Sequence, residues 1–331
     1  MMRPRGGNWS LVLAVAGLMA LLAAIAHAAP IGALKQFRVP TRNSSPLHIT
    51  QGSDGNFWFT EGFVNPPQVV GPHNVGRITP NGDITEFAVC DFCFPNDIVQ
   101  GPNGILYFTK SDPALGRITT SGQVLPDVVV PNSLANGNGI AAHGDDIWFA
   151  AFNTNSIWRY NVTSGQFTEF PLSTQNGSPI PFDIAVDANG IVWFTEFGVN
   201  QIGRLDPQTG AITETPVPGS PRGIAIATDG TVWFTERFSN AVGRLDPATS
   251  QVTEFPLAPG AGPEGIAAAP DGSLWVTQSS AGNIAQITAS GVITEGKSVK
   301  GSEPFGITVA PSGDPWYTEL SATKIAVLQL R

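Results

Sequence analysis

The sequence predicts an all-β fold, a seven-bladed β-propeller whose last blade is completed by the N-terminal strand. Three observations support this prediction. One motif recurs seven times, its period matches a four-stranded blade, and the last copy lacks a strand that the N-terminus can supply. The 37 Gly and 28 Pro among 331 residues are also typical of many short strands joined by tight turns.

Each copy of the motif opens near P-x-x-I, continues to G-x-x-W-F-T-E and I-G-R-I or I-G-R-L, and closes on I-T-E-F. The shared isoleucine recurs at Ile49, Ile98, Ile140, Ile184, Ile224, Ile266 and Ile307. The steps between these positions are 49, 42, 44, 40, 42 and 41 residues. A period of about 40–45 residues that holds four short strands is typical of a propeller blade.

Within each copy, β-branched and aromatic residues alternate with small or polar ones, as half-buried strands require. D-G, N-G and S-G pairs fall between the expected strands, where hairpin turns need positive φ angles. The long first step indicates an insertion from Gly62 to Asn74, between the second and third strands of the first copy. We expect this insertion to form a loop that overhangs one face.

The two ends of the chain predict how the ring closes. The seventh copy stops at residues 325–330, after its third strand, whereas residues 34–39 match the I-T-E-F-P segments. Pairing this N-terminal strand with the last blade would seal the ring and remove open sheet edges. This count favours seven blades over six or eight.

The first 28 residues have the pattern of a signal peptide. Arg3 and Arg5 precede an apolar run over residues 11–25, and Ala26-His27-Ala28 supplies small residues at a cleavage site. We expect cleavage after Ala28, which leaves residues 29–331 as one propeller domain, monomeric and exported to the periplasm or secreted, with no membrane association. The alternative is an uncleaved N-terminal anchor.

The charge of the chain disfavours a nucleic-acid partner. The sequence holds 17 basic and 26 acidic residues, for a formal net charge of -9. Such a chain repels phosphate backbones, and no basic stripe compensates. The acidity fits either simple solubility or a cation-binding mouth.

The chain has two cysteines, Cys90 and Cys93, in C-D-F-C. In an oxidising compartment they fit a local disulfide that fastens a loop, with two inert thiols as the alternative. A redox pair would need a thioredoxin-like context, and a zinc site would need two more ligands.

Residues that recur in nearly every copy are interpreted as structural. We expect the Trp and Phe of W-F-T to fill the space between blades, and the Arg of I-G-R to support backbone or T-E side chains. Two variable positions carry more information. The residue after each opening Pro reads Leu47, Asn96, Asn138, Phe182, Arg222, Glu264 and Phe305. The position after W-F-T reads Glu61, Lys110, Ala151, Glu196, Glu236, Gln278 and Glu319.

We expect these two rings of side chains to converge at one mouth of the axis, because the first strand of a blade lines it. The candidates for ligand contacts are His48, Asn96, Asn138, Arg222, Glu236 and Glu264. Four Glu in one ring repel each other unless Lys110 and Arg222 neutralise them or a divalent cation binds. A solvated acidic mouth with internal salt bridges is the alternative.

The motifs P-x-G-I, D-G-x-x-W-F-T-E, N-x-I-G-R-I and G-x-I-T-E-F resemble the virginiamycin B lyase (streptogramin lyase) family, over essentially all of residues 29–331. The resemblance implies a seven-bladed propeller that uses magnesium to open a cyclic depsipeptide by elimination at its ester linkage. In that family, the last blade reads E-P-H-G-I and then a W-F-x-x-E-like segment. Its His acts as base and its carboxylates hold the metal, while a second His in the preceding blade contacts substrate.

By this resemblance, Glu303 and Glu319 match the carboxylates that hold magnesium. Phe305 stands at the position of the catalytic His, and Glu264 stands at the position of the second His. A phenyl ring cannot accept a proton, so the catalytic residue stays unassigned. Glu264 could act as base only if burial raised its pKa.

Outside the first 28 residues, the histidines are His48, His73 and His143. His48 lies one position later than the family's His and is expected to face the mouth. His73 is expected in the insertion loop and His143 near a turn. None of them is placed by its motif as the missing base.

Three functions remain open at this point. The first is a magnesium-dependent lyase that opens a cyclic ester, a depsipeptide or a lactone. The second is a non-catalytic propeller that binds a small molecule, peptide or glycan at its mouth. The third is a metal-dependent lactone hydrolase, since the fold alone does not choose among these activities.

Overall fold

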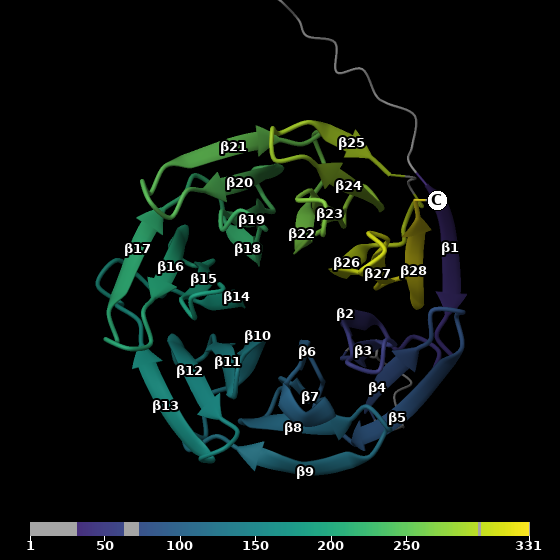
Figure 1. Cartoon of the computed structure of the whole chain (residues 1–331), viewed down its shortest axis with the longest axis horizontal. Coiled ribbons are helices and arrows are strands. Elements are labelled where there is room, and N and C mark those ends of the chain that lie inside the picture. Colours follow the sequence, from purple (N-terminus) through teal and green to yellow (C-terminus); the bar gives the residue numbers. More distant parts are fainter. Residues whose placement is uncertain (1–31, 63–72, 297–298, 331) are drawn as a thin grey trace, which may run out of the picture.

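The computed structural model describes residues 32–62, 73–296 and 299–330. Over these residues the chain forms seven four-stranded sheets around a central axis, which confirms the predicted propeller (Figure 1). The expected signal peptide and most of the expected insertion lie outside the described residues. Among the described residues, η1 (Pro102–Gly104) is the only helix, and no helix is long and apolar enough to cross a membrane.

The strands run from the axis to the rim in sequence order in the first six blades. The first blade holds β2 (Pro46–Gln51), β3 (Phe57–Glu61), β4 (His73–Ile78) and β5 (Ile84–Cys90). The second holds β6 (Ile98–Gln100), β7 (Ile105–Phe108), β8 (Ala114–Thr119) and β9 (Val124–Val129). The third holds β10 (Gly137–His143), β11 (Asp146–Ala151), β12 (Ser156–Asn161) and β13 (Gln166–Pro171).

The remaining blades repeat this order and end at the closure. The fourth holds β14 (Pro181–Val186), β15 (Val192–Glu196), β16 (Gln201–Leu205) and β17 (Ile212–Pro216). The fifth holds β18 (Pro221–Ile226), β19 (Val232–Glu236), β20 (Ala241–Leu245) and β21 (Val252–Pro256). The sixth holds β22 (Pro263–Ala268), β23 (Leu274–Gln278), β24 (Asn283–Ile287) and β25 (Ile293–Glu295). The seventh holds β26 (Pro304–Val309), β27 (Pro315–Glu319), β28 (Lys324–Gln329) and β1 (Ala33–Arg38).

The N-terminal strand closes the ring as predicted. β1 pairs antiparallel with β28, with Leu34 opposite Leu328 and Phe37 opposite Ile325. Phe37 also stacks on Trp316, with ring centroids 6.0 Å apart. The first and last parts of the sequence therefore share one sheet, which Figure 1 shows as the purple and yellow strands side by side.

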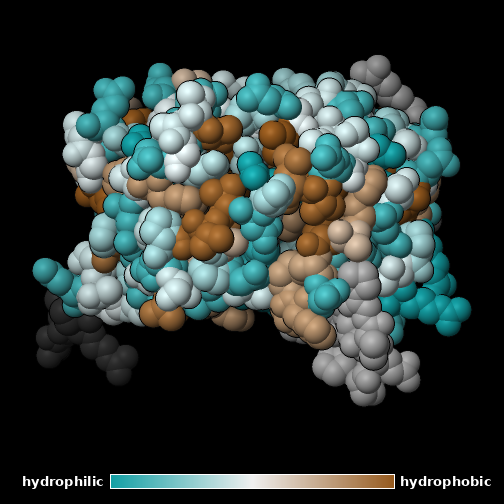
Figure 2. Space-filling view, turned by 90° about the horizontal axis from the view of Figure 1, so that it is seen from below, coloured by the Kyte–Doolittle hydropathy of each residue, from teal (hydrophilic) through white to brown (hydrophobic). Residues whose placement is uncertain are grey.

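The second strand of each blade forms the core between blades. Trp58 of the first blade is fully buried and packs with Ile98, Leu106 and Phe108 of the second blade. The expectation that W-F-T fills the space between blades is therefore met here. From the side the molecule is a flat disc on which apolar side chains form patches between hydrophilic ones (Figure 2).

The Arg of the I-G-R segment stacks on the Trp of its own blade. The two residues face each other in the strand register, as Trp58 does Arg77. The guanidinium carbon lies 5.6–5.8 Å from the Trp ring centroid for Arg77, Arg159, Arg204 and Arg244. At this distance the Trp ring and the guanidinium group form a cation–π contact. Two arginines of the I-G-R segments follow the expected backbone role: Arg117 donates to the carbonyl of Pro126, and Arg244 donates to that of Ala289.

The Thr of W-F-T links each blade to the next. Its hydroxyl accepts a hydrogen bond from a backbone N–H in the innermost strand of its own blade. The same hydroxyl donates to a backbone carbonyl of the following blade. Thr235, for example, lies 2.9 Å from the nitrogen of Gly223 and 2.6 Å from the carbonyl oxygen of Glu264. The donated bond recurs from Thr60, Thr109, Thr195, Thr235, Thr277 and Thr318. In the third blade, Ala150 replaces the Thr.

The structure corrects the expected position of His73. The sequence placed this residue in the insertion loop, but it begins β4 and is only 2% exposed. Its ring packs against Phe94, with centroids 4.4 Å apart. The strand therefore begins earlier than the repeat suggested, because His73 pairs with Cys90 of β5.

Candidate functional site

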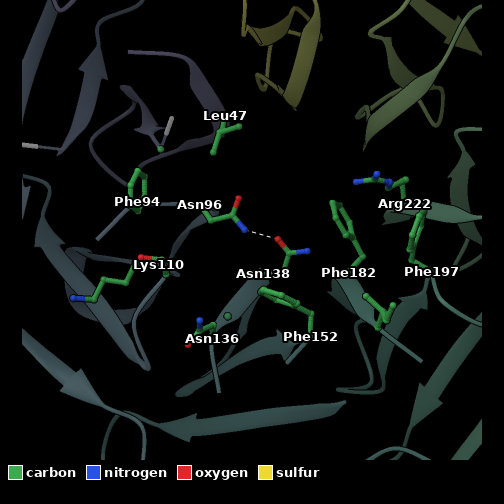
Figure 3. Close-up of a pocket in the computed structure, with 14 residues that line it drawn as sticks. Leu47, Phe94, Asn96, Lys110, Asn136, Asn138, Phe152, Phe182, Phe197 and Arg222 are labelled. Atoms are coloured by element: carbon green, nitrogen blue, oxygen red, sulfur yellow. Dashed lines mark hydrogen bonds between the residues drawn. The ribbon is translucent and has the colours of Figure 1, made fainter. Parts of the chain in front are cut away.

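A cavity of about 440 Å³ opens at one mouth of the axis, over the first five blades (Figure 3). Five of the seven residues at the first variable position line it: Leu47, Asn96, Asn138, Phe182 and Arg222. This part of the predicted mouth is therefore assembled as expected. In four of these blades the residue falls where the pairing of the innermost strand is irregular, as between Pro221 and Ile224, whereas Asn96 precedes β6.

Aromatic side chains form much of the cavity wall. Phe94, Phe152, Phe182 and Phe197 all line it, and the Arg222 guanidinium carbon lies 4.3 Å and 4.7 Å from the ring centroids of Phe182 and Phe197. Phe197 continues outward to Phe238, 6.2 Å away between centroids. These contacts hold Arg222 in place while its planar cation borders the cavity.

The polar side chains of the mouth differ in how many hydrogen bonds and ion pairs they make with the rest of the protein. Asn96 Nδ2 of the second blade donates to Asn138 Oδ1 of the third blade. Lys110 Nζ is held by Asp127 and by Asp112, the latter at 3.1 Å, so its charge is paired inside the second blade. Arg222 Nε has no hydrogen-bond partner among the described residues and lies 3.9 Å from Glu264 Oε2. Arg222 is thus the less tightly engaged of the two cations that line the cavity.

Phe94 follows a disulfide-closed loop. Cys90 ends β5, and its sulfur is bonded to Cys93. The next residue, Phe94, has a positive φ of 41° and lines the mouth. The C-D-F-C segment therefore fastens one wall of the cavity.

A smaller cavity of about 120 Å³ lies along the axis and shares Phe182 with the mouth cavity. His48, Asp97, Asp183, Glu264 and Phe305 contribute to its lining. His48 Nδ1 lies 3.3 Å from Asp97 Oδ1, and the imidazole meets the Phe305 ring edge-on at 5.3 Å. His48 therefore does face the axis, at a deeper level than the first ring.

Two buried aspartates fasten neighbouring inner strands. Asp97 accepts the backbone N–H groups of Ile98 at 2.7 Å and Ile140 at 3.0 Å. Asp183 accepts those of Ile184 at 2.8 Å and Ile224 at 2.9 Å. Each carboxylate thus joins its own blade to the next one.

Burial sets the protonation of this channel. Burial lowers the pKa of His48 to about 4, although the charge of Asp183 acts to raise it. Burial raises the pKa of Asp97 and of Asp183 to about 7, although two backbone N–H groups on each favour the anion. The imidazole is therefore neutral at neutral pH, and the aspartates titrate in the physiological range.

Of the second predicted ring, Lys110 lines the mouth cavity, but the four Glu line neither cavity, so for them the expected convergence was wrong. Glu61, Glu196 and Glu236 are 0–1% exposed and meet Glu86, Glu214 and Glu254 of the fourth strand in their own blades. Glu236, a candidate ligand contact, binds the backbone N–H of Gly219 instead and lines neither cavity. Their side chains extend toward the fourth strand of the blade, which lies at the rim, and away from the axis.

Glu303 and Glu319, the carboxylates matched to a metal, each have an internal partner. Both oxygens of Glu319 lie 2.7 Å from Gln36 Nε2, and Glu303 accepts the hydroxyl of Ser321. Burial raises the pKa of Glu319, which Gln36 and Lys324 oppose. Among the residues described, no group of three His, Cys, Asp or Glu could hold a metal. Carboxylate oxygens are the kind of donor that a hard cation takes, but both oxygens of Glu319 face Gln36.

Glu264 and Phe305 occupy the two positions where the resemblance has histidine. Glu264 is 3% exposed, and Arg237 Nη1 is in direct contact with its carboxylate. This contact occupies the carboxylate that would have to act as the base. Neither residue, as folded, offers a free base to the mouth.

Sequence reasoning missed several residues of the site. Asp97 and Asp183 stand two positions after the opening residue, where four copies have Gly and the first has His48. Gly223 shows why Gly is common there, since a Cβ would lie 2.5 Å from the carbonyl oxygen of Glu264. The replacement of this Gly by Asp97 and Asp183 was the feature of the sequence that could have marked them as site residues. Phe94, Phe152 and Phe197 lie outside the repeated inner strand and gave no comparable signal.

Comparison with protein families and solved structures gives a consistent result. The Virginiamycin B lyase family model matches residues 22–220 and 211–331. No curated protein sequence matches the chain. A streptogramin B lyase structure has a TM-score of 0.81 at 28% identity, covering 91% of this chain and 98% of its own.

A second solved structure is similar to the same extent. It is a catalytically inactive histidine-to-alanine variant of virginiamycin B lyase from Staphylococcus aureus with quinupristin, with a TM-score of 0.81 at 29% identity. The match covers 90% of this chain and 99% of that one. Kuenenia stuttgartiensis hydrazine synthase, at 15% identity and a TM-score of 0.72 over 88% and 97% of the two chains, shares the fold alone.

Proposed function

Since this chain belongs to the virginiamycin B lyase family, we propose that it is an exported protein that binds a cyclic depsipeptide or lactone at its central mouth and opens the ring by elimination at the ester linkage. The observation that carries the proposal is the cavity of about 440 Å³ at the mouth. Small-molecule sites are typically concave, largely apolar and equipped with a few fixed polar groups.

The lining supports a ligand that combines aromatic or apolar groups with amides. Phe94, Phe152 and Phe197 offer apolar surface, and stacking on such rings is favourable beyond burial alone. The bond from Asn96 to Asn138 leaves one acceptor on Asn96 and one donor on Asn138, a pair that matches a peptide group. The Staphylococcus aureus relative with quinupristin supports this ligand class.

A second candidate function, ligand binding without turnover, is favoured by one observation. Phe305 cannot accept a proton, and Glu264 is paired with Arg237. Binding and chemistry are therefore measured separately. Calorimetry with quinupristin measures binding, and mass spectrometry measures the product. Elimination leaves the mass of the ligand unchanged and adds a double bond, whereas hydrolysis adds the mass of one water.

We expect Phe197→Ala to weaken quinupristin binding by about tenfold, because loss of a buried aromatic contact typically costs about 1–2 kcal/mol. The control is Phe92→Ser, since Phe92 is 80% exposed and does not line the cavity. Equal affinity of Phe197→Ala and the unsubstituted protein would place the ligand elsewhere. Binding without a product would favour the second function.

Magnesium dependence is part of the proposal. Glu303 and Glu319 would hold the ion, which would supply charge stabilisation to the ester oxygens. Binding of a cation to the folded state would raise Tm by a few degrees, roughly 2–4 °C, at concentrations far above Kd. The double variant Glu303→Gln, Glu319→Gln should lose this rise. A rise of the same size in both proteins would show that the ion binds at another site.

Export is proposed from residues 1–28, whose basic, apolar and small-residue segments follow in the order of a signal peptide. N-terminal sequencing of the protein from the extracytoplasmic fraction should begin at Ala29. Recovery of the chain only from the membrane fraction, with Met1 retained, would instead indicate the anchor.

A further inference from the structure

We infer that His48, oriented by Asp97, is the base of this site and takes the role of the histidine that Phe305 replaces. The inference rests on the proposed elimination and specifies its proton acceptor. His48 is in the first blade, and Phe305 is in the neighbouring seventh blade. The base has thus moved by one blade around the axis.

The position of His48 brings its imidazole beside the ring of Phe305, which stands where the resemblance has a histidine. The His48 and Phe305 rings are in edge-on contact, with centroids 5.3 Å apart. The inner strands of the two blades pack closely here, because a Cβ at Gly306 would lie 2.6 Å from His48 Cα. An imidazole at His48 can therefore serve the same part of the channel.

Asp97 is a positioning residue. One oxygen of its carboxylate lies 3.3 Å from His48 Nδ1. The carboxylate is itself fixed by the backbone N–H groups of Ile98 and Ile140. A proton on Nδ1 facing Asp97 leaves Nε2 as the acceptor, the arrangement of a base that a third group orients. Among the described residues, none makes a hydrogen bond to His48 Nε2.

A ligand group can reach this imidazole from the mouth. The His48 side chain is 22% exposed and lines the axial cavity of about 120 Å³. That cavity and the mouth cavity share Phe182, and Leu47, the residue before His48, lines the mouth. A ring held in the mouth would therefore place one ester edge over the axial cavity.

The charges that face His48 set its pH dependence. They are Asp97 and Asp183 from the second and fourth blades, and Glu264, which is paired with Arg237 and lies near Arg222. Burial keeps the pKa of His48 at about 4, so its neutral form is present above that pH. The pKa of Asp97 is about 7, so its anion, which stabilises the imidazolium formed in the reaction, develops as pH rises through 7. Activity should rise in the same interval.

The proposed step balances without another reactant. His48 Nε2 takes the proton from the carbon next to a carbonyl, and the electron pair of that C–H bond forms a C=C bond. The bond between the adjacent alkyl carbon and the ester oxygen breaks, and its electron pair leaves with the carboxylate. The imidazolium then returns its proton to solvent.

The test uses quinupristin as the probe and compares four variants with the unsubstituted protein. His48→Gln should lower kcat about 10²–10⁴-fold and leave the calorimetric Kd unchanged. Asp97→Asn should lower kcat and remove the rise in rate near pH 7, a change that a purely structural role would not produce. His143→Gln, on the exposed end of β10, should match the unsubstituted protein. Phe305→His restores a histidine in the seventh blade.

A second measurement needs no substrate. Diethyl pyrocarbonate acylates unprotonated, accessible imidazole nitrogen, so His48 should be modified at pH 6 and protected by quinupristin. Turnover by His48→Gln at the unsubstituted rate would overturn the inference and leave the proposed function standing. Turnover by Phe305→His alone would also overturn it. If neither the unsubstituted protein nor Phe305→His binds or converts quinupristin, the proposed function and the inference are both overturned.

Discussion

In three blades a buried glutamate meets a second glutamate of the fourth strand, and single residues decide how these pairs respond to pH. Glu196 is fully buried and faces Glu214. Burial and then Glu214 raise the pKa of Glu196 to about 8. In the sixth blade the same position is Gln278, whose Nε2 donates to Glu295 at 2.8 Å. The repeat thus contains an acid pair and its amide counterpart in equivalent places.

Glu196→Gln should stabilise the protein in alkaline solution. A raised pKa means that the folded state holds the proton, so stability is full below about pH 4.5 and falls as pH rises through 8. The amide removes this loss, and a gain of about 1 kcal/mol would raise Tm by about 2–4 °C at pH 8.5. Thermal melts at pH 5 and 8.5 measure it. Gln278→Glu, the reverse change, should lower Tm at pH 8.5, and identical shifts in both variants would contradict the explanation.

At the scale of the element, the Thr of W-F-T determines how one blade is attached to the next. Thr235 is fully buried and makes one bond within its blade and one to the carbonyl of Glu264. Sequence analysis assigned packing to the Trp and Phe of this segment but no role to the Thr. The hydroxyl explains the preference for Thr, because Val has the same shape without the two bonds.

Thr235→Val should destabilise the protein by about 1–3 kcal/mol, because it leaves a buried N–H and a buried carbonyl without partners. Denaturant unfolding measures the change. Thr213→Val, on an exposed position of β17, is the control and should change stability by less than about 0.5 kcal/mol. A similar small effect at both positions would mean that the inter-blade bonds contribute little.

At the scale of the whole molecule, closure through β1 is the feature on which the other contacts depend. The strand covers the edge of β28 and adds Leu34 and Phe37 to the cores beside it. Without β1 this edge would be open to pairing with other chains. The mouth cavity and the axial cavity both need a closed ring, since their linings come from five and six different blades.

Removal of residues 1–38 should destabilise the protein by several kcal/mol, roughly 3–6 for the apolar side chains that lose their burial. It should also cause aggregation, detected by light scattering during the melt. The matched control begins at Ala29 and keeps β1, and it should melt as the protein with residues 1–28 does. A monomeric, equally stable protein without β1 would contradict the importance of closure.

The sequence by itself determined the blades, their number and their closure. The blades and their number depend on contacts between residues close in sequence, which recur with the repeat and leave a period that can be counted. The closure joins residues far apart, such as Leu34 and Leu328, but the strand missing from the last copy indicated it. It also placed Asn96, Asn138 and Arg222 at the mouth, because each follows the opening residue of a copy. His48 was expected to face the mouth and lies on the axis, one level deeper.

Only the tertiary structure decided what these positions face. Glu61, Glu196 and Glu236 point to the rim, since the direction of a side chain depends on strand register and on irregular pairing that the motif does not specify. The contact of His48 with Phe305 joins two ends of the chain across the closure. Such a contact has no period in the sequence, because it exists only once the ring is sealed.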